Sequence, residues 1–253
     1  MTNPSDERPI KPSRRRFLIA ASATALAPEI AGLASAQSPA QVSGTQDAPA
    51  PQGPASQPEL TPSAGLEGYQ FLTQPDVEAL TAMVNRLIPA DEFGPGGVEA
   101  GVVTFIDRQL GGQFGAAARW YMQGPWAEGS PSQGWQLALT PAEIYRTGFR
   151  SLDRWCLGSK GKRFAELAAN DQDEVLTLLQ SGKIELNGIP SASFFQILWQ
   201  NTVEGYLGDP LYGGNRDMAA WRMIHFPGSN PVLTPAVDLN GELYETDPIS
   251  IGP

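Results

Sequence analysis

The chain has 253 residues, enough for one substantial domain or two small ones. Its 27 acidic residues exceed its 17 basic ones, and beyond residue 36 the excess is 24 acidic against 12 basic, a negative field that argues against a nucleic-acid partner. A single cysteine excludes an internal disulfide and cysteine-held zinc or iron–sulfur clusters.

The N-terminus has the features of an export signal. The stretch SRRRFL, which contains Arg14, Arg15, Phe17 and Leu18, has the twin-arginine pattern, and ASAQ at 34–37 supplies a small-x-small cleavage site. The apolar run over 17–27 is too short for a membrane-spanning helix, which needs about 20 residues. We therefore predict a twin-arginine signal peptide over 1–36. Because this pathway carries folded proteins, a cofactor or a partner acquired before export is expected, and a partner is favoured since the chain shows no cofactor motif.

Residues 37–68 are rich in Pro, Ala, Ser, Gln and Gly and have almost no large apolar side chains. Such a segment cannot offset the entropy of ordering by burial, so we expect a flexible linker. The last residues, 229–253, carry no helical pattern and are expected to form an irregular, extended C-terminal arm.

Helical signals begin at FLTQPDVEALTAMVNRLIPAD. Thr73 is placed to cap the first helix and Asp76 to complete a capping box, with Pro75 in the first turn. A second helix is predicted over 98–110, ended by two glycines. Between 120 and 137 three Trp, three Gly and two Pro predict a packed, aromatic-rich loop without regular structure.

Three further helices follow. One begins after Thr140, with Glu143 closing a capping box; another covers about 170–180; the last starts after Pro190. No stretch shows the period-two alternation of a strand bounded by hairpin turns. The sequence thus predicts an all-α domain over 69–228, with about five to seven helices joined by long Gly/Pro-rich loops.

Catalytic and metal-binding patterns are sparse. His225 is the only histidine, so a site built on several imidazoles is excluded and a Ser-His-Asp device would have to use this one residue. Glu204, Asp209 and Asp217 could in principle serve a two-carboxylate hydrolase. The structural interpretation is favoured: Asp209 starts a turn, Asp217 caps a short helix, and Glu204 pairs with Arg216 or Arg222. We expect no catalytic, cofactor-binding or metal-binding residue in this chain.

Cys156 lies between Trp155 and Leu157. This setting favours a buried thiol. The alternative is a disulfide to another subunit, since an unpaired cysteine in an exported protein can bridge to a second chain.

The segment GDPLYGGNRDMAAW, residues 208–221, is the most distinctive in the chain. Asp209 and Pro210 favour the start of a turn, and Gly213, Gly214 and Asn215 accept positive φ. We predict a sharp reversal followed by a short helix. Tyr, Trp and Arg dominate binding hot spots, so a rigid docking surface is favoured over a reaction pocket.

This segment, continued by RMIHFPG, resembles the C-terminal signature of the gluconate 2-dehydrogenase subunit 3 family. FLTQPDVEALTAMVNRLIPAD, GVVTFIDRQL, WYMQGPW, LTPAEIYRTGFRSLD and FAELAANDQDEVL are also similar to that family, over about 69–228. Arg222 and His225 depart from its usual pattern. The signature matches are carried over as structural or interface positions: Gly208, Asp209, Pro210, Tyr212, Gly213, Gly214, Asn215, Arg216, Asp217 and Trp221, to which Tyr206 is added as a neighbouring aromatic.

The resemblance implies the small subunit of a membrane-associated dehydrogenase. In such a complex a flavoprotein of the glucose–methanol–choline type holds FAD and oxidises the sugar or sugar acid, and a multihaem cytochrome c passes the electrons on. The small subunit helps the flavoprotein fold and carries it through the twin-arginine translocase to the periplasm. The alternatives left open are a periplasmic small-molecule binding module and a stand-alone carboxylate-dependent hydrolase.

Overall fold

The computed structural model describes residues 68–127, 129, 130, 136–230, 239 and 244–252, all of which belong to the second of the chain's two units, Pro62–Pro253. The predicted signal peptide, with Arg14, Arg15, Phe17 and Leu18, lies outside the described residues. The same holds for residues 37–67 of the predicted linker and for most of the C-terminal arm between 231 and 243.

Helices dominate the described residues, which confirms the predicted all-α class. The elements are α2 (Gln74–Leu87), α3 (Val102–Gly111), α4 (Pro141–Lys160), η2 (Phe164–Glu166), α5 (Ala169–Gln180), β1 (Glu185–Leu186), β2 (Ile189–Pro190), α6 (Ser191–Leu207), η3 (Pro210–Tyr212), η4 (Arg216–Met218) and α7 (Ala219–Met223). The hairpin β1–β2 was not predicted, because strands of two residues are too short to show alternation.

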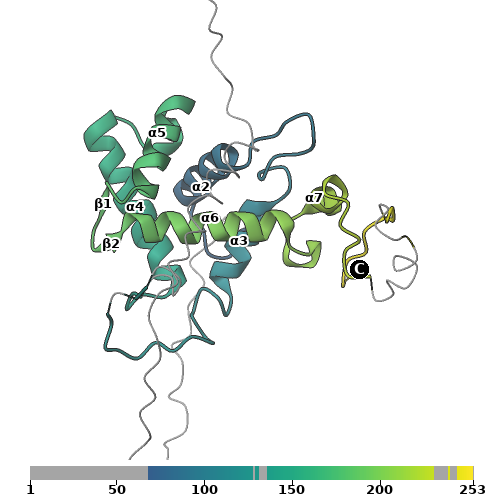
Figure 1. Cartoon of the computed structure of the whole chain (residues 1–253). Coiled ribbons are helices and arrows are strands. Elements are labelled where there is room, and N and C mark those ends of the chain that lie inside the picture. The colour runs from purple at the N-terminus through teal and green to yellow at the C-terminus, as the bar shows by residue number, and fades with distance from the viewer. Residues whose placement is uncertain (1–67, 128, 131–135, 231–238, 240–243, 253) are drawn as a thin grey trace, which may run out of the picture. The chain divides into compact units, whose positions relative to one another are not determined.

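Helix α6 organises the core. It packs against α2, α3, α4 and α5, with the β1–β2 hairpin at one end and α7 at the other (Figure 1). Tyr145 and Phe149 of α4 meet Phe194 of α6 edge to face, with ring centroids 5.9 and 6.0 Å apart. Gly148 lets the Phe194 ring lie directly on the α4 backbone, because a Cβ there would overlap the ring.

Capping residues set the starts of α2 and α4 where the sequence predicts them. Asp76 accepts hydrogen bonds from Thr73 N and Oγ1 before α2, and Glu143 accepts the same pair from Thr140 before α4. The predicted start of α3 at residue 98 is wrong. Gly101 has φ +85°, which interrupts the helical backbone, so α3 begins at Val102.

A buried carboxylate ties the first described residues to α3. Asp107 is fully buried, and its two carboxylate oxygens accept hydrogen bonds from the backbone N–H groups of Gln70, Phe71 and Leu72 at 2.7–2.9 Å. The sequence analysis missed this role. One signal for a buried carboxylate was available: Asp107 lies on the same face of the helix as Val103 and Leu110, both of which are buried.

The described residues of the aromatic loop after α3 are irregular, as predicted, but their side chains are not all packed. Trp120 lies edge to face against Phe114 at 5.7 Å between ring centroids, whereas the Tyr121 side chain is 79% exposed. No helix among the described residues combines the length and the apolar character that crossing a membrane requires.

Candidate functional site

The 208–221 segment reverses the chain directly after α6. Asp209 precedes η3, and its Oδ1 accepts a hydrogen bond from Leu211 N at 3.0 Å. Gly213 has φ +98° and Asn215 has φ +41°, left-handed backbone that Gly and Asn adopt more readily than other residues. Helices η4 and α7 follow at once. The reversal and the short helix therefore form as the residue types predict.

Asn215 holds the two ends of this reversal together. It is fully buried; its N–H donates to Gly205 O, its Nδ2 donates to Gly208 O, and its Oδ1 accepts from Ala220 N, each at 2.9 Å. Asn215 thus satisfies an N–H in the first turn of α7, the capping role that the sequence analysis assigned to Asp217. That prediction is wrong because Asp217 lies within η4, and the Ala220 N–H of α7 donates to Asn215 instead.

The backbone of the segment lies in contact with α6. A Cβ at Gly214 would overlap the carbonyl oxygen of Gly205, and a Cβ at Gly205 would lie 2.7 Å from Phe105 Cδ1 on α3. Further along the segment, the backbone N–H of Arg216 donates a hydrogen bond to Ala100 O at 3.0 Å, which joins the segment to the loop before α3. The backbone of the reversal therefore lies on α6, and α6 in turn lies on the Phe105 side chain of α3.

Two of the predicted interface aromatics are buried in this chain's own core. Tyr206 OH donates to Pro95 O at 2.9 Å, and Trp221 Nε1 donates to Leu207 O at 2.6 Å. The Trp221 ring also meets Phe226 edge to face, with 5.2 Å between ring centroids. These side chains stabilise the reversal and offer little area to a partner.

Other side chains of the same region are exposed and apolar. Tyr212 is 47% exposed, and Pro210 and Gly213 are half-buried beside it, while Arg216 and Asp217 are exposed polar neighbours. We call the following set of exposed side chains the α6-end surface: Leu207, Leu211, Tyr212, Ile224 and Phe226. A soluble monomer seldom leaves so many large apolar side chains uncovered in one region.

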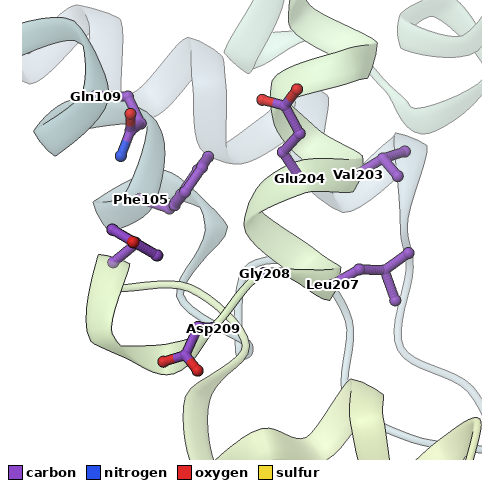
Figure 2. A pocket seen from close by; sticks show the side chains of 8 residues that line it. Phe105, Gln109, Val203, Glu204, Leu207, Gly208 and Asp209 are labelled. Carbon is purple, nitrogen blue, oxygen red and sulfur yellow. The ribbon is translucent and has the colours of Figure 1, made fainter. Parts of the chain in front are cut away.

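A groove of about 540 Å³ opens between α3 and the end of α6, next to this surface (Figure 2). Phe105 lies between Gln109 of α3 and Glu204 of α6, and Asp209 lies at the turn below them. The remaining lining residues are Val203, Leu207, Gly208 and Tyr212. The groove is open and mainly apolar, a shape that suits a side chain of another protein better than an enclosed small ligand.

The last described residues are held against this region by Asp209. Its Oδ1 accepts from Ser250 Oγ at 2.7 Å and its Oδ2 accepts from Ile251 N at 2.9 Å, in addition to the bond from Leu211 N. Burial acts to raise the pKa of Asp209, but these three hydrogen bonds outweigh burial and lower the pKa below its ordinary 3.8. The contacts thus stabilise the fold at neutral pH, weaken below about pH 3.8, and are lost as the pH falls through the lower folded value.

The carboxylates are not arranged as a hydrolytic pair. The oxygens of Asp209 are occupied by the three hydrogen bonds, and Asp217 does not line the groove. The expected pairing of Glu204 with Arg216 or Arg222 is wrong: Glu204 accepts from Gln200 Nε2 at 2.9 Å. Each arginine instead reaches a nearby backbone carbonyl, at 3.3 Å.

The single histidine lies outside the groove. His225 is exposed directly after α7, with φ +54°. Across the described part of the chain, no three His, Cys, Asp or Glu side chains are grouped closely enough to hold a metal ion.

Cys156 is buried in α4, which agrees with the apolar role and not with an accessible bridge to another subunit. Burial raises the pKa of its thiol to about 12. At pH 8 we expect a thiol reagent to modify the folded protein at least about a hundredfold more slowly than the denatured protein, because only the thiolate reacts. Colorimetric thiol titration measures both rates. Rapid modification of the folded chain, or a reducible mass shift of the complex on electrophoresis, would contradict the buried assignment.

Comparison with known proteins places this chain in a family. Residues 74–228, more than half of the chain, match the family model described as gluconate 2-dehydrogenase subunit 3. A search of curated proteins and a search of solved structures found no match. The matched residues include α2 to α7, the whole of the 208–221 segment and Gly228, where the chain's end is joined to the segment that follows α7. The chain belongs to the gluconate 2-dehydrogenase subunit 3 family.

Proposed function

We propose that this chain is the non-catalytic small subunit of a periplasmic, FAD-dependent gluconate or sugar dehydrogenase. In this proposal it is the folding partner of the flavoprotein catalytic subunit and its escort through the twin-arginine translocase. FAD belongs to the catalytic subunit and haem c to a multihaem cytochrome subunit, and the complex is membrane-associated. The family's name, that of a numbered dehydrogenase subunit, supports a role within an assembly.

The observation that carries the proposal is the α6-end surface. Its apolar side chains are exposed, yet the backbone that presents them is fixed by Asn215, Asp209 and the close approach of Gly214 to α6. Holding exposed apolar groups in one conformation lowers the entropy lost when another protein covers them. A stable subunit interface is therefore the use of this surface that best fits its chemistry.

The escort role is tested at the signal. We expect Arg14→Lys combined with Arg15→Lys to leave both this chain and the flavoprotein in the cytoplasm, because the passenger has no signal of its own. Cell fractionation followed by immunoblotting of both proteins and assay of FAD-dependent dehydrogenase activity in each fraction measures the result.

Arg8→Lys is the matched control, since it makes the same exchange outside the twin-arginine motif and is expected to leave export unchanged. Should the double variant strand this chain while the flavoprotein still reaches the periplasm, the escort role is wrong. Full periplasmic activity in a strain that lacks this chain would refute both the escort and the folding role.

A further inference from the structure

We infer that the end of the chain, residues 249–252, is part of the surface that binds the catalytic subunit, and that Asp209 is the positioning residue that holds it there. The inference rests on the proposed function for the identity of the partner. It goes further in assigning a binding role to residues beyond the family match, which ends at residue 228.

The chain's end is held at two independent places. At the first, Asp209 binds Ser250 Oγ and Ile251 N, and Ser250 Oγ in turn accepts from Gly252 N at 3.2 Å. At the second, a parallel bridge joins Gly228 to Ile249: Ser229 N donates to Ile249 O at 2.7 Å, and Ile249 N donates to Pro227 O at 3.2 Å. These contacts join the chain's end to residues that are distant in the sequence, so residues 249–252 are part of the folded unit.

Close packing accompanies these hydrogen bonds. A Cβ at Gly228 would overlap Ile249 O and would lie 2.9 Å from Trp221 Cζ3, so the bridge lies directly on the buried Trp221 ring. A Cβ at Gly252 would lie 2.8 Å from Leu211 Cδ1. The chain's end therefore lies on the 208–221 segment itself, next to α7 (Figure 1).

The docked residues enlarge the α6-end surface. Ile249 and Ile251 remain exposed, Ile251 by 58%, while the backbone that carries them is hydrogen-bonded. They add two large aliphatic side chains to the group formed by Leu211 and Tyr212. A partner that covers the apolar surface can also bury these two side chains, because the backbone that carries them is already ordered.

The charges around this surface indicate the chemistry of the partner. Exposed charges of both signs lie around it: the carboxylates are those of Glu204, Asp217 and Asp247, and the basic groups include Arg216 and Arg222, of which Arg222 lies 4.0 Å from Asp247. We therefore expect the catalytic subunit to meet it with an apolar face bordered by charged groups of both signs.

Two measurements on the full mature chain test the inference. Hydrogen exchange reports the Ile251 amide in the free chain, and biolayer interferometry reports binding of the FAD-containing catalytic subunit of the same organism. In Asp209→Asn the side-chain NH2 group faces the Ile251 N–H, and two donors form no hydrogen bond. The Ile251 amide should therefore exchange much faster, and binding of the catalytic subunit should weaken roughly tenfold. Ile251→Ser should weaken binding by a similar factor with the Asp209 contact intact, and it keeps the test valid if Asp209→Asn folds poorly.

Glu185→Gln, an exposed carboxylate-to-amide change in β1 at the opposite end of α6, is the control and should change neither measurement. Unchanged protection of Ile251 in Asp209→Asn overturns the positioning role. If that amide is deprotected but neither variant weakens binding, the binding role is overturned while the proposed function stands. A wild-type chain that does not bind the catalytic subunit at all overturns the proposed function, and the binding role with it.

Discussion

Replacing Asp107 by alanine is expected to lower the free energy of unfolding by about 3–5 kcal/mol, since each buried donor left without an acceptor costs about 1–3 kcal/mol. The change removes the acceptor of three backbone N–H groups, those of Gln70, Phe71 and Leu72. The hydrogen bonds of Phe71 and Leu72 are buried. Urea unfolding of the mature chain, followed by tryptophan fluorescence and circular dichroism, measures the loss.

Asp107→Asn separates charge from acceptor geometry, because it keeps one oxygen for Phe71 and Leu72 and places an amide donor against Gln70 N–H. It should lose less stability than Asp107→Ala. Glu185→Gln, on the surface, should stay within about 0.5 kcal/mol of the wild type. A loss below 1 kcal/mol for Asp107→Ala would mean that these bonds do not fix the segment before α2.

Gly214→Ala is expected to destabilise the chain by about 3 kcal/mol, at the upper end of the usual cost of inserting a methyl group into a packed site. The added Cβ would overlap Gly205 O, and this oxygen cannot retreat easily because Gly205 is itself packed on Phe105. The same oxygen accepts from Asn215 N, so any shift also loosens the hydrogen bonds of Asn215. Binding of the catalytic subunit should fall together with stability.

Gly158→Ala is the matched control for this substitution. Gly158 lies within α4 and a Cβ there meets nothing within 4 Å, so the change should raise stability by about 0.5–1 kcal/mol through helix propensity. Thermal and urea unfolding of both variants in parallel give the comparison. If Gly214→Ala is as well tolerated as Gly158→Ala, the contact between the 208–221 segment and α6 does not support the surface.

Much of the helical architecture could be predicted because its signals are local. The capping pairs Thr73–Asp76 and Thr140–Glu143 act over three residues, and the apolar repeats of α2, α4 and α6 act over single turns. Gly213 and Asn215 accept left-handed backbone by their own chemistry, so the reversal after α6 was also predictable. The start of α3 was not, because a single Gly101 conformation outweighed a continuous apolar pattern.

The sequence by itself determined the all-α class, the helix order, the reversal and the family resemblance, since each depends on residues close together in the chain. Only the tertiary structure decided which aromatics are buried, that Asn215 and not Asp217 accepts a hydrogen bond from the first turn of α7, and that Asp107 and Asp209 bind distant backbone. The bonds of Asp107 and those of Asp209 to the chain's end span 35–42 residues. The sequence around a carboxylate does not show which distant N–H group it will bind, because that pairing forms only when the helices pack and exclude water from both groups.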